Sequence, residues 1–147
     1  PNPRAAVPLL ASAARGGNMD AALALARLYA AGAEGVPSNA PSRLRWTRVA
    51  ARAGHPPAIA ALAYLTERGI GRPADPVAAA QGYVAALETG EVEPGALRAA
   101  GGPSAPGWDR QTAVEFQLIL QARGLYDGPI DGIVGRGTRA GAAALAD

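Results

Sequence analysis

Few residues of this chain have types that could carry out chemistry. The sequence contains one histidine, His55, and no cysteine, which excludes disulfides and thiol catalysis and argues against a zinc site. No Gly-x-Ser-x-Gly motif accompanies the histidine, so a nucleophile activated by a neighbouring base is not expected. Asp127 and Asp131 could pair for glycoside hydrolysis, but each directly precedes a glycine, which is typical of turns. We therefore predict a protein without catalytic residues, metal ligands or cofactors.

Arginine carries all of the positive charge. All 14 basic residues are arginine, there are 12 acidic residues, and the net charge of +2 is too small to indicate binding to nucleic acid. One predicted helix carries four of these arginines, which are Arg43, Arg45, Arg48 and Arg52. Planar guanidinium groups suit carboxylates on an acidic partner, so this helix is a candidate partner-binding surface. The alternative is a solvated helix face that binds nothing.

The chain contains an internal repeat with a period of about 37 residues. Residues 13–17 read AARGG and residues 50–54 read AARAG, and the apolar positions of the following helix recur with them. A turn with glycine and proline then follows each copy, at residues 35–39 and 71–75. Such repetition is typical of stacked helical repeats, in which each unit buries its apolar face only against its neighbours.

The spacing of apolar residues and the glycine and proline boundaries predict an all-α fold. We expect helices over residues 4–15, 20–31, 41–53, 57–68 and 76–88, and a short helix ending near residue 100. Residues 101–107 are rich in glycine and proline and predict a linker. Asp109 then caps a helix that ends near residue 124, and a turn-rich loop leads to a last helix over 137–145. No segment provides the roughly 18 apolar residues of a membrane span.

Residues 4–90 resemble the Sel-one-like repeat family, which is related to tetratricopeptide repeats. The family pattern A-A-x-x-G, a helix and G-x-G-V-P-x-D is matched by residues 50–54 and 69–75, and Trp46 takes the aromatic position of the first repeat. Gly82 stands where the second repeat would carry tryptophan, and Asn39 replaces the usual aspartate. The resemblance implies a short α-solenoid of helix–turn–helix repeats over residues 1–100, whose curved surface binds other proteins.

Residues 108–147 resemble the small helical peptidoglycan-binding domain found at the ends of many bacterial wall enzymes. The resemblance is carried by Gln117, Leu120 and the run from Gly124 to Thr138, although Gly141 stands where the family prefers alanine. It implies a wall-binding unit, for which a tyrosine ring could contact sugars and arginines could hold stem-peptide carboxylates. Turn and cap chemistry offers a second explanation for the aspartate and the threonine. The candidate peptidoglycan-binding residues are Tyr126, Asp127, Asp131, Arg136, Thr138 and Arg139.

Together the two resemblances imply a non-catalytic module of a bacterial cell envelope, located in the periplasm. It would bind a protein partner through the repeats and peptidoglycan through the C-terminal unit. The order of the two units is similar to that at the periplasmic end of the alphaproteobacterial polar organelle development proteins. Two alternatives remain open: a targeting appendage of a larger enzyme, such as a wall hydrolase or a caspase-like protease, or a structural subunit of an envelope machine. Because the chain begins at Pro1 and has no signal-peptide pattern, we expect a mature or excised part of a longer protein.

Overall fold

The computed structural model describes residues 2–147, and the regular structure in this range is entirely helical. The prediction of an all-α chain is therefore confirmed. Each long helix begins at, or within one residue of, its predicted start. None of the helices in residues 2–147 is long and apolar enough to cross a membrane. The elements are α1 (Pro3–Arg15), α2 (Met19–Ala31), α3 (Ala40–Arg52), α4 (Pro56–Arg68), α5 (Pro76–Glu88), the 3₁₀ turns η1 (Pro94–Ala96) and η2 (Ala99–Gly101), α6 (Arg110–Ala122) and α7 (Arg136–Ala146).

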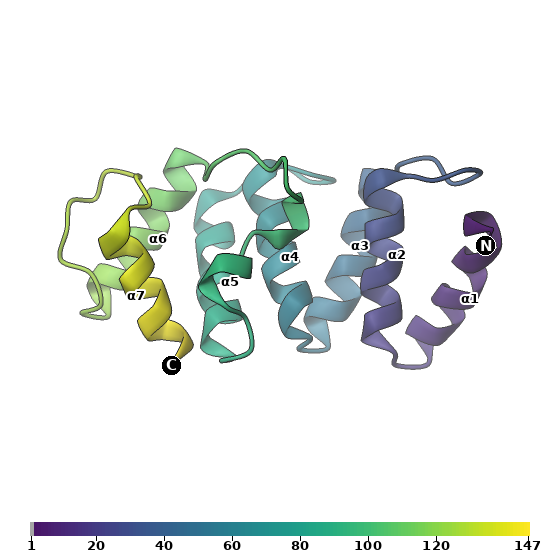
Figure 1. Ribbon diagram of the computed structural model, residues 1–147, viewed down its shortest axis with the longest axis horizontal. Helices are drawn as coiled ribbons and strands as arrows, with labels where there is room; N and C mark the ends of the chain where they lie inside the picture. Colours follow the sequence, from purple (N-terminus) through teal and green to yellow (C-terminus); the bar gives the residue numbers. More distant parts are fainter. Residues whose placement is uncertain (1) are drawn as a thin grey trace.

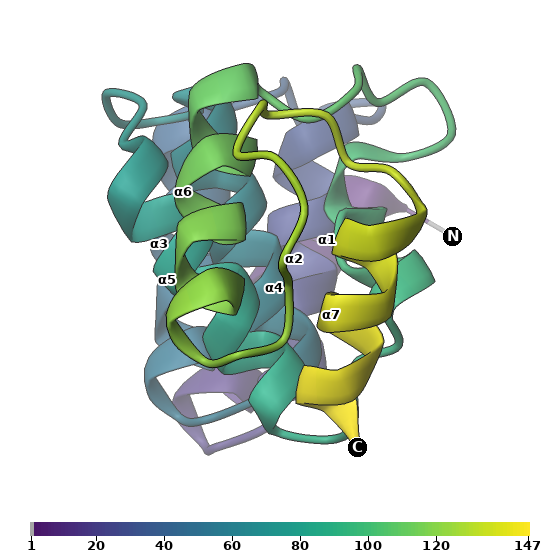
Figure 2. The same cartoon turned by 90° about the vertical axis from the view of Figure 1, so that its left-hand side faces the viewer.

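Helices α1 to α6 stand in a row, and each packs against the next one along the chain (Figure 1). The two chain termini lie at opposite ends of this row. Helix α7 packs against both α5 and α6. The loop between α6 and α7, residues 123–135, runs along α6 before α7 begins (Figure 2). The molecule is thus an elongated stack of helices closed at one end by α6 and α7.

Local sequence signals explain where these helices begin and end. The Asn18 side chain accepts a hydrogen bond from the Ala21 amide at 3.0 Å, and Asp109 accepts one from the Thr112 amide at 3.0 Å. Such caps satisfy amides that have no partner inside the helix. The predicted role of Asp109 as a helix cap is confirmed. At the other end of α2, Gly32 has a φ of +72°, and a Cβ there would lie 2.9 Å from the Ser38 nitrogen. Only glycine fits this turn without strain.

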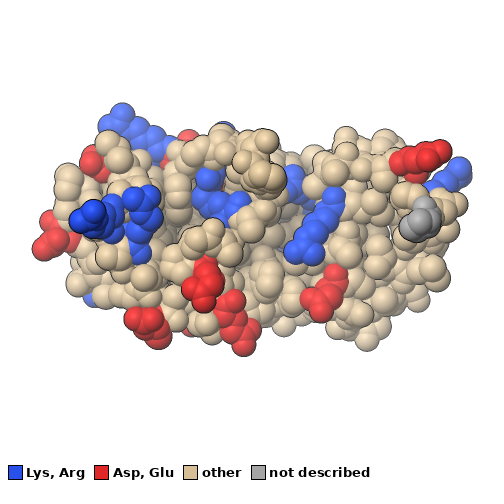
Figure 3. Space-filling view, viewed as in Figure 1, with Lys and Arg blue, Asp and Glu red and all other residues tan. Residues whose placement is uncertain are grey.

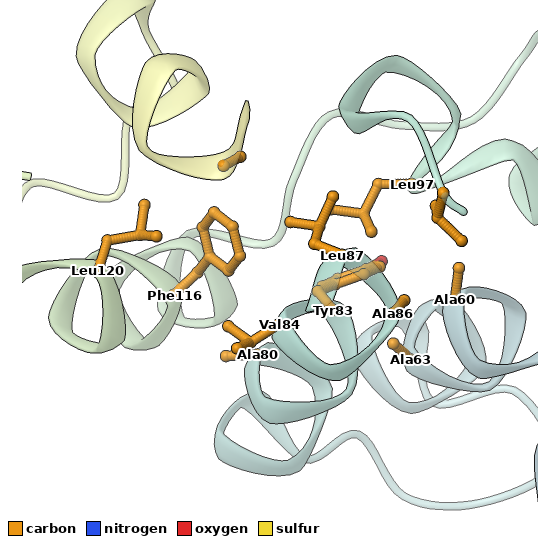
Figure 4. Packing of buried hydrophobic residues seen from close by; sticks show 12 residues of the cluster. Ala60, Ala63, Ala80, Tyr83, Val84, Ala86, Leu87, Leu97, Phe116 and Leu120 are labelled. Atoms are coloured by element: carbon orange, nitrogen blue, oxygen red, sulfur yellow. The ribbon is translucent and has the colours of Figure 1, made fainter. Parts of the chain in front are cut away.

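The apolar core of α4 and α5 continues into the C-terminal helices. Tyr83 of α5 is fully buried and Phe116 of α6 is 1% exposed, and they belong to one cluster that also includes Ala142 of α7. Figure 4 shows Phe116 lying toward Val84 and Leu87 of α5. The last two helices therefore bury their apolar faces against α5, so a cut after residue 100 would expose this core.

Candidate functional site

The single histidine stands at the start of a helix. His55 takes the N-cap position of α4, and its Nε2 lies 3.3 Å from Oδ1 of Asp20 in α2. Within residues 2–147, no group of three or more histidine, aspartate or glutamate side chains is placed to hold a metal ion.

A buried glutamine organises the loop that resembles a peptidoglycan-binding site. Gln117 of α6 is fully buried. Its Oε1 accepts hydrogen bonds from the amides of Asp131 and Gly132 at 3.1 and 2.9 Å. Its Nε2 donates to the carbonyl of Ile133 and to Oγ1 of Thr138, both at 3.0 Å. One side chain thus satisfies polar groups from the loop and from α7, which fixes the loop against α6.

Three of the six candidate wall-binding residues are engaged inside this loop. Thr138 is only 1% exposed, and it bonds to Gln117 and does not act as the N-cap of α7, a position that Gly135 takes. Asp131 accepts a hydrogen bond from the Ile133 amide at 2.9 Å, and this bond is the main cause that lowers the pKa of its carboxyl. The Tyr126 hydroxyl donates to the Pro129 carbonyl at 2.7 Å. These groups shape the loop.

The other three candidates remain accessible. Asp127 is exposed in the loop, and Arg136 and Arg139 are exposed on the first turns of α7. The Arg139 guanidinium makes one long hydrogen bond, of 3.4 Å, to the Val134 carbonyl. Both arginines come from the same end of one helix, so they can present guanidinium groups to an anionic ligand together.

The four arginines of α3 do not form one surface. Arg45, Arg48 and Arg52 follow helical spacing and share one face of α3. The Arg45 guanidinium lies over the Trp46 ring, with 5.2 Å from Cζ to the ring centroid. Arg43 lies on another side, where its Nη2 donates to the Ala100 carbonyl at 2.8 Å. The structure therefore separates Arg43 from the other three.

A buried carboxylate that the sequence did not reveal forms an ion pair within residues 1–100 and also accepts a hydrogen bond from the C-terminal unit. The Glu67 side chain in α4 is fully buried. Arg98 donates two hydrogen bonds to its carboxylate, from Nε at 2.9 Å and from Nη2 at 2.7 Å. The Tyr83 hydroxyl also donates to this carboxylate, and the Asp109 amide donates to it at 2.9 Å. We call these four residues the Glu67 cluster.

The Glu67 cluster keeps its carboxylate charged despite burial. Burial alone would favour the neutral acid. The hydrogen bonds from Arg98, Tyr83 and the Asp109 amide, with the charge of Arg98, outweigh burial and lower the pKa of Glu67. Burial and the hydrogen bond to Glu67 together raise the pKa of Tyr83 far above its ordinary value. The tyrosine therefore acts here only as a hydrogen-bond donor.

Arg98 also holds the residues that composition predicts to be a linker. Its Nη1 donates to the Pro106 carbonyl at 2.8 Å, and its Nη2 donates to the Gly107 carbonyl at 3.3 Å. The guanidinium lies between two rings, 5.3 Å from the centroid of Tyr64 and 5.6 Å from that of Trp108. Residues 101–107 are therefore attached at their far end to α4 through Arg98. The repeats and the C-terminal unit sit in a defined relation to each other.

The chain that leaves α5 turns back across α4. We call residues 91–102 the 91–102 segment; it contains η1 and η2, and η2 contacts α4. Leu97 of this segment is 3% exposed and belongs to the same buried cluster as Ala60 of α4. Ala100 packs against the cluster of Tyr64 and Leu65. The segment thus covers one face of α4. Leu97 holds it there through apolar packing, and the adjacent Arg98 holds it through the ion pair with Glu67.

Beside the 91–102 segment lies an open hollow of about 490 Å³, which we call the α2 hollow. Its apolar wall comes from α2, α4 and the segment. Two arginines, Arg27 and Arg43, line it from α2 and α3, and two glutamates, Glu91 and Glu93, line it from the segment. Figure 3 shows basic side chains near the middle of the molecule, with acidic side chains below them. The apolar lining residues include Leu23, Ala26, Ala30, Ala60, Ala61, Leu65, Val92 and Leu97.

No known protein family, curated protein or solved structure matches this chain. The chemistry of the candidate sites therefore rests on their own residues. The α2 hollow offers apolar burial together with two guanidinium groups, which is the composition of a binding site for a partly apolar, partly charged ligand. The face of α7 with Arg136 and Arg139 offers charge without a comparable hollow.

Proposed function

We propose that this chain is a non-catalytic binding module of a bacterial cell-envelope protein. Its helical repeats form a short α-solenoid that binds a protein partner, and its C-terminal unit contacts peptidoglycan in the periplasm. The resemblances to Sel-one-like repeats and to peptidoglycan-binding domains support both halves of the proposal. The Glu67 cluster would hold the two binding surfaces at a fixed distance from each other.

One observation carries the protein-binding half. The face of α4 already binds a segment of the chain outside the long helices, because the 91–102 segment, with its two 3₁₀ turns, lies across it with Leu97 buried and Arg98 paired to Glu67. The same face continues over α2, where the α2 hollow lies. A surface that binds a segment of its own chain in one repeat is suited to bind a segment of another protein in the next.

The wall-binding half depends on Arg136 and Arg139, and co-sedimentation with purified peptidoglycan sacculi tests it. We expect the full chain to pellet with sacculi, and the Arg136→Glu/Arg139→Glu variant to pellet about tenfold less, as expected when two charge-assisted contacts are lost. The control is Arg45→Glu/Arg52→Glu, which makes the same charge change on α3. The full chain is used because α6 and α7 share a core with α5.

Two outcomes would contradict wall binding. Failure of the full chain to pellet would show that it does not bind the wall, and an equal loss in both double variants would show only a general attraction to an anionic surface. The first outcome would favour the alternative of a structural subunit in an envelope machine. The internal hydrogen bonds of Tyr126, Asp131 and Thr138 favour that alternative, because they leave few free polar groups for a glycan.

A further inference from the structure

The equivalent faces of α2 and α4 carry different residues at the same repeat positions. Helices α2 and α4 begin about 37 residues apart, so their positions can be compared one by one. Where α4 carries Ala60 beneath Leu97, α2 carries Leu23 in the wall of the α2 hollow. Where α4 carries Glu67, the carboxylate that pairs with Arg98, α2 carries the uncharged Ala30. The α2 face therefore keeps the apolar character of the α4 face but lacks its acidic group.

The α2 face carries positive charge, whereas the α4 face carries the negative charge of Glu67. Arg27 of α2 stands at the position of Tyr64 of α4, the ring over which Arg98 lies. Arg27 is exposed, and no carboxylate among residues 2–147 lies within 4.0 Å of a guanidinium nitrogen of Arg27 or Arg43. The α4 face thus binds an arginine, Arg98, whereas the α2 face has arginines of its own that can bind an acidic group.

Arg43 is the more enclosed of the two arginines. It is half-buried, its Nη2 donates to the Ala100 carbonyl, and burial lowers the pKa of its guanidinium. A partly buried cation without an acidic partner is unfavourable, and a carboxylate from a ligand would offset this cost. Glu91 and Glu93 belong to the 91–102 segment and line the hollow from the wall that this segment forms. The acidic group of a ligand is therefore expected on the α2 and α3 side.

We propose that the α2 hollow binds a short segment of a partner protein in which an apolar residue is followed by an acidic one. The apolar side chain packs on Leu23 and Ala30, and the carboxylate pairs with Arg27 and Arg43. The volume of about 490 Å³ lies within the range of about 300–1,000 Å³ that is typical of small-ligand sites. The bound segment lies next to the 91–102 segment and repeats its arrangement with the opposite charge. This inference rests on the proposed protein-binding role of the repeats.

Selection of random peptides displayed on phage against the full chain tests the proposal. We expect the enriched peptides to share an apolar residue followed by aspartate or glutamate. A synthetic, fluorescein-labelled copy of an enriched peptide is then titrated with the protein by fluorescence anisotropy. Arg27→Glu should weaken its binding at least tenfold, and replacing the peptide's acidic residue by lysine should do the same. Ala30→Phe, which fills the hollow, should also abolish binding.

Matched controls separate this site from the rest of the surface. The Arg27 side chain is exposed on α2, so Arg27→Glu should keep the wild-type circular dichroism spectrum. Arg52→Glu makes the same charge change on another face, and it should leave binding unchanged. Peptides that lose binding with Arg52→Glu but not with Arg27→Glu would overturn this inference and leave the protein-binding function standing. Enriched peptides without an acidic residue would overturn the charge pairing. No enriched peptide at all would overturn the protein-binding function as well.

Discussion

The face of α4 is closed by the protein's own chain, whereas the face of α2 is open. Both helices have 13 residues and occupy equivalent places in consecutive repeats. Over α4, the 91–102 segment buries Leu97 and anchors Arg98 on Glu67. Over α2, the equivalent space is the α2 hollow, with Arg27 and Arg43 on its wall. The two faces therefore differ in what covers them: the α4 face is covered by the 91–102 segment, and the α2 face is the one that we propose for partner binding.

We call the part of the molecule with α4 and α5 the closed half, and the part with α1 and α2 the open half. The closed half should be the more stable of the two. It combines an apolar anchor, an ion pair whose carboxylate is fully buried, and the tilted ring stack of Tyr83, Trp108 and Phe116, with centroid distances of 4.9 and 5.1 Å. The open half depends on a separate core around Leu25 and Trp46. Variants that remove one contact at a time should therefore lower the stability of the two halves to different extents.

The largest effect is expected from removing the Glu67 carboxylate. Glu67→Ala leaves Arg98, the Tyr83 hydroxyl and the Asp109 amide without their shared acceptor. We expect a loss of about 3–5 kcal/mol in the free energy of unfolding, because breaking one side of a buried pair leaves the other charge uncompensated. Urea denaturation followed by circular dichroism measures it.

The matched control is an exposed ion pair between α5 and the residue that follows α6. Arg123, after α6, pairs with Glu88 of α5 at 2.7 Å, but both side chains are close to half exposed. Water and salt screen such a pair, so Glu88→Ala should leave the denaturation midpoint almost unchanged. Equal effects of Glu67→Ala and Glu88→Ala would contradict a special role for the Glu67 cluster.

A smaller loss is expected from the apolar anchor of the 91–102 segment. Leu97→Ala leaves a cavity over α4, and we expect it to cost about 3 kcal/mol, near the middle of the range for buried leucines. Ala30→Leu on the open half adds volume to an existing hollow and should change stability by less than about 1 kcal/mol. Thermal and urea denaturation of both variants compare the two halves. A larger loss from Ala30→Leu than from Leu97→Ala would show that the α2 face is already tightly packed.

The smallest expected effect is the contribution of Glu67 to the pH dependence of the free energy of unfolding. The pKa of Glu67 lies below its ordinary value of 4.5 in the folded protein, so the folded state binds fewer protons than the unfolded state in this range. The stabilisation from Glu67 is complete at a pH above its pKa in the unfolded state, and it is lost as the pH falls through its pKa in the folded state. We expect the free energy of unfolding to decrease between about pH 6 and pH 3, and to decrease less in Glu67→Gln. Parallel pH curves for the two proteins would contradict this assignment.

The helices could be predicted from the sequence because their signals are local. Asparagine or aspartate caps, prolines in the first turn and glycines after the last turn lie within a few residues of each boundary. The role of Asp109 as a cap followed from such a signal. The periodicity that marks the repeats is equally visible, since it needs only two copies in one chain.

The contacts that join distant segments could not be predicted in the same way. Glu67 and Arg98 are 31 residues apart, and neither has a sequence pattern that points to the other. Composition identified residues 101–107 as a linker but could not show that Arg98 holds the Pro106 and Gly107 carbonyls. The arginines of α3 appeared as one group, although helical geometry turns Arg43 toward the α2 hollow. The hollow itself depends on the path of the 91–102 segment, which no local signal sets.

Amide hydrogen exchange of the full chain, with and without the peptide selected by phage display, can locate the partner site on the helices. Without peptide, we expect α4 and α5 to exchange more slowly than α1 and α2, because the closed half opens less often. On addition of the peptide, protection should increase in α2, in the first half of α3 and in the 91–102 segment. Increased protection confined to α7, or to the face of α3 that carries Arg45, Arg48 and Arg52, would contradict the claim that the open face of α2 is the partner site.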